Sequence, residues 1–396
     1  MDRIRLGDLD EVFPPELVDA VLAKSQACEV RVRLLPPRLM VYFALARALF
    51  CPEPYLGVLR TLAVAARHED EWGEWRVPDK AAVFRARRKL GVEPMHELLV
   101  HTGTAVADAR TPGAFWRGLR LMGVDGTTLP AAYSQANEAG LGRLQTRPDK
   151  GPTGSPLARV MVLVEVGSRA ICDAAVDSHR VEERVLVERL ARSFRPGMLV
   201  LADRGLPGAQ LWQLLAATGA DLLLRIPGIV KLPVAEVLSD GSWISTVLDR
   251  RSGGVRPPQD VRVRVIEYSR EIACRKRAET YQLITTLMDP ERAPTTELAA
   301  LYGERWELDN TLAELETTQI GSRTVLPSKS PELVFQEIYA HLVLYTGVRV
   351  LMHRAAVNRS DPLDPGRLSF AAALRAARHS VTSLNREPSG PLENGV

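Results

Sequence analysis

The segment from residue 118 to residue 226 alternates short apolar runs with amphipathic stretches, and this order constrains the fold more than any other feature. Three runs of strand length follow one another, and then come a helical stretch, a strand, a helix and a strand. The strand-like runs are GLRLMGVDG (118–126), ARVMVLVEV (158–166), RAICDAAV (169–176), PGMLVLADRG (196–205) and ADLLLRI (220–226). Such an order predicts an α/β fold in which a mixed sheet carries helices on its faces.

The flanking residues predict further parts of the chain. Residues 1–110 have helical apolar spacing with proline starts, which predicts an all-helical N-terminal domain. Residues 227–280 combine Pro, Gly and Arg with short β-like runs, so we expect a β-rich insertion there. Residues 281–356 return to a strand and two long helices, which complete the sheet domain. Residues 380–396 have the composition of a disordered tail.

The composition is ordinary for a globular chain. The 396 residues include 46% hydrophobic residues and carry a net charge of +3, which is compatible with a nucleic-acid partner without requiring one. The four cysteines have no zinc-ligand spacing, and no apolar run approaches the length of a membrane span. The first residues contain no apolar signal region, so we expect a cytoplasmic protein.

Two aspartates stand at the ends of apolar strand runs, Asp125 after LMGV and Asp203 after LVLA. Because Asp-Gly is a common turn signal, Asp125 alone could be ordinary turn chemistry. The ends of neighbouring strands can converge where ligands bind, however, and two converging carboxylates need a proton or a cation between them. Mg²⁺ prefers oxygen ligands and phosphate partners, so it fits such a pair.

The amphipathic run 301–316 supplies a third acid. On one continuous helix, with about 100° per residue, Tyr302, Arg305, Asp309 and Glu316 share a polar stripe beside a stripe of leucines. The leucines would pack on the sheet while the polar stripe overlooks the strand-end aspartates. An amphipathic helix with solvated charges is the alternative interpretation.

Residues 77–94 predict a short basic helix with Asp79 as its N-cap and Gly91 at its end. Its basic residues are Arg85, Arg87, Arg88 and Lys89. A basic helix that follows other helices is typical of helix-turn-helix DNA readers, although a solvated helix face has the same composition. We therefore regard residues 1–110 as a candidate DNA-binding domain.

The three acids lie in segments that resemble the motifs of a known family. The chain reads VDGTTL at 124–129, LADRG at 201–205 and YGERWELDNTLAELE at 302–316. These segments resemble DGT, a D-R-G-like segment and Tyr-x2-Arg-x3-Glu-x6-Lys of the bacterial insertion sequence four family of DDE transposases. FPPELVDAV and LLPPRLMVYFALA resemble this family's N-terminal domain, so the resemblance covers nearly the whole chain.

The resemblance implies an RNase H-like catalytic core and a DNA transposase of an insertion sequence. Such an enzyme cuts the ends of the element and joins them to target DNA by two-metal phosphoryl transfer. By resemblance, Asp125, Asp203 and Asp309 are the catalytic residues and hold Mg²⁺, for which Mn²⁺ can substitute. The family also implies that the protein acts as a homodimer on double-stranded DNA.

The resemblance also implies DNA contacts around these acids. Tyr302 and Arg305 would contact phosphate near the cut, as their family equivalents do. Arg204, beside Asp203, is a further expected phosphate contact. Trp243, in the β-rich insertion, could stack on an extruded base, and a core or surface tryptophan is the alternative.

Two positions depart from the family's pattern. Asp309 stands where the family has Glu, so the acid is one methylene shorter, and Glu316 stands where the family has Lys. A glutamate repels DNA phosphate where a lysine would attract it. The alternative function is therefore a decayed or repurposed transposase that binds DNA without cutting it. A metal-dependent hydrolase of small phosphates also fits the carboxylates, but it leaves the N-terminal helices and the insertion unexplained.

Overall fold

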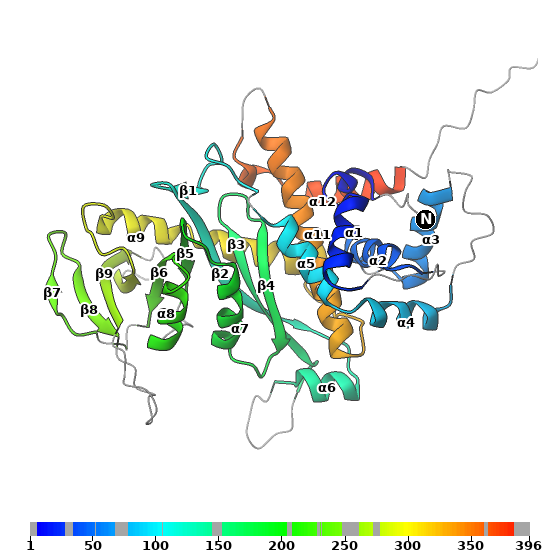
Figure 1. Cartoon of the computed structure of the whole chain (residues 1–396), viewed down its shortest axis with the longest axis horizontal. Coiled ribbons are helices and arrows are strands. Elements are labelled where there is room, and N and C mark those ends of the chain that lie inside the picture. Colours follow the sequence, from blue (N-terminus) through cyan, green and yellow to red (C-terminus); the bar gives the residue numbers. More distant parts are fainter. Residues whose placement is uncertain are drawn as a thin grey trace, which may run out of the picture. The chain divides into compact units, whose positions relative to one another are not determined.

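A computed structural model describes residues 6–27, 35–51, 53–67, 78–104, 106–144, 153–203, 208–227, 230, 232–247, 261–271, 278–359 and 363–383. The chain divides into two compact units, and most of their helices and strands are labelled in Figure 1. Unit 1 comprises residues 1–104, 130–140 and 313–396, and unit 2 comprises residues 105–129 and 141–312. Each unit therefore combines segments that are far apart in the sequence. Within the described ranges, no helix combines the length and apolarity that a bilayer crossing requires.

Unit 1 is helical. Its elements are η1 Gly7–Glu11, α1 Pro15–Lys24, α2 Pro37–Leu49, α3 Tyr55–Arg67, α4 Lys80–Leu90, α5 Glu93–Thr102, α6 Gln135–Leu141, η3 Glu314–Gly321, α11 Pro331–Val357, η4 Pro365–Arg367 and α12 Phe370–Ser383. Helix α11 is buried along nearly all of its length and packs against α2, α5 and α12. Because α11 is buried on nearly all sides, it forms the centre of this unit.

Helix α12 reaches further than the sequence suggests. It ends at Ser383, so the first residues of the segment expected to be disordered are helical. The helix is held because Phe370, Leu374, Ala377 and Val381 are buried at the spacing of one helix face. Residues 384–396 of the expected tail lie outside the described residues.

Unit 2 is built on one mixed sheet. Its strands are β1 Phe115–Trp116, β2 Leu119–Pro130, β3 Leu157–Glu165, β4 Ile171–Ser178, β5 Met198–Ala202, β6 Asp221–Ile226, β7 Glu236–Val237, β8 Trp243–Val247, β9 Val261–Glu271 and β10 Ala278–Thr285. Its helices are α7 Glu183–Leu190, η2 Ala191–Ser193, α8 Ala209–Ala216, α9 Thr295–Gly303 and α10 Trp306–Ala313. The sheet and its flanking helices confirm the predicted α/β class.

The strand order is β4-β3-β2-β5-β6-β10-β9-β8-β7, with β1 paired to β2. Strands β2, β5 and β6 are parallel neighbours, and β10 joins β6 in the antiparallel direction. The strands that lie in residues 227–280 continue this same sheet through β10 instead of forming a separate one. The β-rich segment thus extends the sheet on the side away from β3 and β4.

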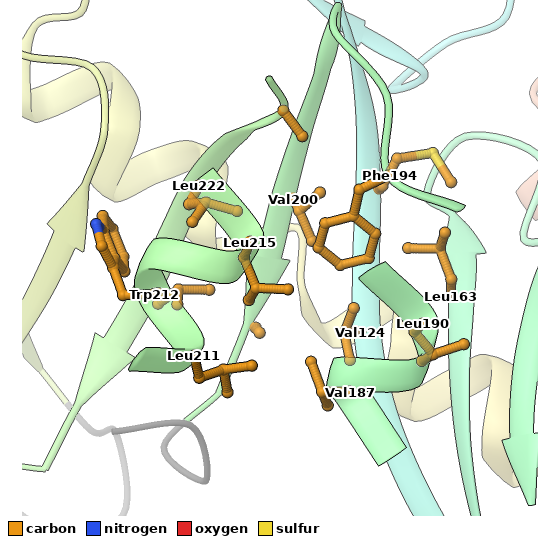
Figure 2. Packing of buried hydrophobic residues seen from close by; sticks show 14 of the residues in the cluster. Val124, Leu163, Val187, Leu190, Phe194, Val200, Leu211, Trp212, Leu215 and Leu222 are labelled. Atoms are coloured by element: carbon orange, nitrogen blue, oxygen red, sulfur yellow. The ribbon is translucent and has the colours of Figure 1, made fainter. Parts of the chain in front are cut away.

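The two faces of the sheet are covered by different helices. Figure 2 shows one face, on which residues of α7 and α8 pack against Val124, Val200 and Leu222. Alternate residues of the same strands point to the other face, where Leu121, Leu199, Leu201, Leu223 and Leu283 pack against α9. The end of this second face carries the polar residues described next.

Candidate active site

Three neighbouring parallel strands bring the strand-end residues together. Val124 of β2, Ala202 of β5 and Leu224 of β6 are register partners. The residues that follow them are Asp125, Asp203 and Arg225. Parallel strands lie about 4.8 Å apart and side chains alternate between the faces, so these three side chains form a row on the α9 face. The convergence expected from the strand ends is therefore present in this register.

Asp203 is surrounded by donors from three elements. The Tyr302 hydroxyl lies 3.3 Å from Asp203 Oδ1, and Arg305 Nη2 lies 3.6 Å from Oδ2. Arg225 Nη1 lies 3.8 Å from Oδ1, and its guanidinium stacks 4.1 Å from the centre of the Tyr281 ring. Asp203 itself keeps 37% of its side-chain surface exposed. Its oxygens therefore face positive charge and remain accessible.

The chain does not form the single helix that the sequence predicts over residues 301–316. Helix α9 ends at Gly303, and α10 begins at Trp306. Between them the backbone makes i to i+3 hydrogen bonds, from Arg305 N to Tyr302 O and from Leu308 N to Arg305 O. Side chains three residues apart nearly eclipse in such a tight turn. Tyr302 and Arg305 consequently both reach Asp203, although the prediction of a continuous helix is wrong.

A second change of helix type follows α10 and includes Glu316. Residues Glu314–Gly321 form the π-helix η3, which belongs to unit 1. The neighbouring Glu314 pairs with Arg349 and accepts a hydrogen bond from Tyr345. On α10, Glu307 pairs with Arg169. The polar stripe expected to run from 302 to 316 is therefore interrupted twice.

Helix α10 approaches β2 closely enough to bring a third acid to the row. A Cβ added at Gly123 would lie 2.3 Å from Leu308 Cδ1, so α10 rests on bare backbone there. The carboxylate of Asp309, the next residue, lies near enough to Asp125 to raise the pKa of that carboxyl group. Two carboxylates held this close repel each other, which disfavours charging both of them.

The electrostatics of Asp125 reflect this crowding. Burial raises the pKa of Asp125 to about 6, the Gly126 N–H and Arg305 oppose the rise, and the Asp309 carboxylate adds to it. Arg305 Nη1 also lies 3.4 Å from Asp309 Oδ1, so this guanidinium faces Asp203 and Asp309 together. Burial would lower the pKa of Arg305, but Tyr302 and the surrounding aspartates raise it. It therefore keeps its charge.

Two of the three expected carboxylates are placed to bind a hard divalent cation. Asp125 and Asp309 lie near each other, and a cation bound between them would offset the repulsion of their charges. Asp203 faces Arg305 and Arg225 instead. Among the described residues, no group of three His, Cys, Asp or Glu side chains is close enough to hold a metal ion. Two of the three expected ligands are thus together, and the third is one strand away.

Two family models match successive parts of the chain. Residues 3–100 match the insertion element 4 transposase N-terminal model, and residues 116–346 match the transposase DDE domain. The chain belongs to the IS4 family of DDE transposases. The sheet of unit 2 is accordingly the RNase H-like core of the DDE domain, and members of this family use divalent metal ions.

Relatives of this transposase include two proteins of Escherichia coli K12. The transposase InsG for insertion sequence element IS4 is 28% identical over 98% of this chain and 86% of its own length. The putative transposase InsZ is 24% identical over 49% of this chain and 62% of its own length. A solved piggyBac transposase synaptic complex with hairpin DNA covers 96% of this chain and 81% of that chain, with 12% identity. Its TM-score of 0.49 is too low to carry details across.

The basic helix divides into an exposed and a buried face. Arg85, Arg88 and Lys89 of α4 are exposed, together with Phe84, whose ring lies under the Arg88 guanidinium. Arg87 is buried and only 6% exposed. We therefore remove Arg87 from the expected DNA contacts, because its guanidinium is bonded inside unit 1.

Two other expected DNA contacts lie elsewhere. Trp243 packs against the hydrophobic core on the α8 side of the sheet, which favours the interpretation of a core tryptophan over base stacking. Arg204 lies outside the described residues, since residues 204–207 are not among them.

The sequence interpretation missed two residues of the site. Arg225 is the basic residue of the mainly apolar run ADLLLRI, at the position that matches Asp125 and Asp203 on the neighbouring strands. Gly123 is a glycine inside another apolar run, which often marks a close approach of a second backbone. Both features are visible in the sequence, although neither residue is acidic.

Proposed function

We propose that this transposase cuts the ends of its insertion sequence and joins them to target DNA, with Asp125, Asp203 and Asp309 as catalytic residues. The observation that carries the proposal is the convergence of the three acids around Arg305. Asp309 lies near enough to Asp125 to raise its pKa, and Arg305 faces both Asp309 and Asp203. Acids held this close are costly to a fold, which is expected where they serve chemistry on phosphate.

The three carboxylates would hold Mg²⁺, or Mn²⁺ in its place. When bound, the cation would lower the pKa of an attacking water and offset the charge that develops on the phosphate. The half-buried position of Asp125 supports this assignment, because a nearby cation is what stabilises a crowded carboxylate pair in its charged form.

Arg305 and Tyr302 would bind the DNA backbone beside the scissile phosphate. The nitrogens of Arg305 lie 3.4 and 3.6 Å from aspartate oxygens, longer than the usual distance of charge-assisted hydrogen bonds. A phosphate offering a two-pronged contact would therefore compete well for this guanidinium. Moving Arg305 to phosphate would free Asp203 to act with the other two acids.

The exposed face of α4 would bind double-stranded DNA at the element ends. It carries Lys80, Arg85, Arg88 and Lys89 around the exposed Phe84, and Asp79 is occupied as the N-cap through Ala82 N. A cationic helix face of this length suits the major groove. We further propose that the protein acts as a homodimer when it holds two ends.

The second candidate function is a DNA-binding protein that does not cut. It is favoured by Glu316, where a lysine would attract phosphate, and by the ion pairs that Asp203 makes with Arg225 and Arg305, which occupy its carboxylate. Such a protein would show salt-sensitive DNA binding without metal-dependent cleavage.

The deciding experiment is a nicking assay with the full chain. A labelled duplex carrying the DNA that flanks the gene is incubated with Mg²⁺ or Mn²⁺. The native chain is compared with Asp125→Ala, with Asp309→Glu, and with Asp309→Glu combined with Glu316→Lys. Glu304→Gln, which changes an exposed acid between α9 and α10, is the matched control.

We expect the native chain and the control to nick at the element end and Asp125→Ala to be inactive. Cleavage that persists without Asp125 contradicts the proposed chemistry. Nicking only by the variants with restored family residues favours the binding protein instead.

A further inference from the structure

The contact between Gly123 and Leu308 has a direct effect on the reach of Asp309. Leu308 is fully buried, and both of its methyl groups and its Cγ would lie within 2.8 Å of a Cβ at position 123. Because Leu308 is enclosed by other residues, rotating its side chain away would require its packed neighbours to move as well. A side chain at this position would therefore push α10 away from β2.

The size of that displacement can be read from the contact. Ordinary van der Waals contact for a Cβ begins at 3.4 Å, and the nearest Leu308 atom would lie at 2.3 Å. Restoring an ordinary contact thus requires α10 to retreat by about 1 Å. The methylene that separates glutamate from aspartate lengthens the side chain by one carbon–carbon bond, about 1.5 Å.

The direction of the displacement matters as much as its size. Gly123 and Asp125 are two residues apart on β2, so they point to the same face of the sheet. Leu308 packs over Gly123, and the adjacent Asp309 meets Asp125. The approach that Gly123 allows is therefore the approach that brings the third acid to the first.

We infer that Gly123 is a positioning residue that compensates for the short acid at position 309. The missing side chain lets α10 come nearer to the sheet by about the length that Asp309 lacks relative to glutamate. This rests on the proposed function, in which Asp309 helps to hold the metal ion. Position 123 and position 309 should then be coupled, so that a Cβ at 123 disfavours aspartate and favours glutamate at 309.

The test measures Mn²⁺ affinity of the full chain by isothermal titration calorimetry without DNA, followed by the nicking assay. Gly123→Ala should weaken Mn²⁺ binding about tenfold or more, as loss of support around metal ligands usually does. Adding Asp309→Glu to Gly123→Ala should restore the affinity. Gly303→Ala is the matched control, because a Cβ there would meet nothing within 4 Å.

A second compensating substitution, at Leu308, keeps the test of Mn²⁺ binding decisive if Gly123→Ala folds poorly. Gly123→Ala combined with Leu308→Val adds one carbon and removes one, so the packing volume is conserved and α10 can stay close. This pair should regain Mn²⁺ affinity while position 309 remains aspartate. A merely structural role for Gly123 would allow this rescue but not the rescue by Asp309→Glu.

The outcomes separate the inference from the proposed function. If the native chain neither binds Mn²⁺ nor nicks DNA, the proposed function fails and the compensation has no role. If the native chain binds Mn²⁺ and Gly123→Ala binds it equally well, the inference alone is overturned. Failure of Asp309→Glu to restore affinity in the Gly123→Ala background overturns it as well.

Discussion

Each unit contains an arginine at the centre of a polar cluster, and the two clusters differ in how completely the arginine is bonded. In unit 1, Arg87 donates to Gln336 at 2.9 Å, to Tyr55 at 2.6 Å, to Ser328 at 3.2 Å and to the Leu333 carbonyl at 3.1 Å. All these partners are neutral. The guanidinium is therefore satisfied by the fold itself.

In unit 2, Arg305 faces acids instead, and its bonds are long. It lies 3.4 Å from Asp309 and 3.6 Å from Asp203, and both aspartates remain partly exposed. Short bonds to neutral groups in a closed interior indicate an arginine that holds the fold together. Long contacts shared between exposed acids indicate an arginine that can exchange its partners for a ligand.

The largest effect on activity is expected from substitution of Arg305, in the partly exposed cluster of unit 2. Arg305→Ala should reduce cleavage of the element end by on the order of a thousandfold, because a preorganised donor to the reacting phosphate is lost. The free energy of unfolding should change by less than about 1 kcal/mol, since the ion pairs are long and partly solvated. Nicking kinetics and urea denaturation of one preparation measure both quantities. A large loss of stability would place Arg305 with Arg87 as a structural residue.

Substitution of Arg87, in the buried cluster of unit 1, should instead change the stability of the fold. Arg87→Met should lower the free energy of unfolding by about 3 kcal/mol, because Gln336, Tyr55 and Ser328 would keep buried polar groups without their partner. Arg88→Met, one residue away and exposed, should change it by less than about 0.5 kcal/mol. Urea denaturation compares the two variants. Equal stability of both would show that Arg87 is not the structural centre we describe.

The interior of unit 1 should also disfavour protonation of a buried histidine, His341. Burial, with a smaller contribution from Arg47, lowers the pKa of His341 to about 3, and Gln319 Nε2 lies 3.3 Å from its Nδ1. Between pH 6.5 and 3 the unfolded chain binds a proton that the folded chain does not, so stability falls as pH falls. The loss due to His341 is about 1.4 kcal/mol per pH unit in that window.

Thermal unfolding of the native chain between pH 7 and 5, compared with His341→Gln, isolates this contribution. His101→Gln, which changes an exposed histidine of α5, is the control. A pH dependence that His341→Gln leaves unchanged would show that the site admits a charged histidine.

The smallest effect is expected on the exposed face of α4. Arg88→Gln should reduce the slope of log affinity for duplex DNA against log salt concentration by about 1, as loss of one phosphate contact does. Folding should be unaffected, in contrast to substitution of its neighbour Arg87. Fluorescence anisotropy at several salt concentrations measures the slope, and an unchanged slope would remove Arg88 from the DNA interface.

The fold class could be predicted from the sequence, because strand lengths and apolar runs are local features. The strand-end positions of Asp125 and Asp203 could be read in the same way, whereas the catalytic role of the three acids stays a prediction. The burial of Arg87 was also readable, since Val83, Arg87 and Leu90 share one helix face at a spacing of four and three residues. The break between α9 and α10 was not readable. It depends on backbone bonds that tighten around Arg305, and the apolar spacing is the same on either side of it.

The register that aligns Asp125 with Asp203 also depends on more than local pattern. It requires β5 to lie beside β2, although β3 and β4 come between them in the sequence. The composition of 227–280 likewise could not show that its strands extend the same sheet. Sequence reasoning thus finds which residues carry chemistry more readily than it finds which residues position them.

The interleaving of the two units has a consequence for synthesis of the chain. Helix α11, which forms the centre of unit 1, is made long after the N-terminal helices that pack on it. Gln336, Ser328 and the Leu333 carbonyl, which hold Arg87 and hence α4, also arrive late. At bacterial rates of translation, the last hundred residues take on the order of ten seconds. The nascent chain therefore cannot fix Arg87 and α4 in their final positions until the ribosome has nearly completed it.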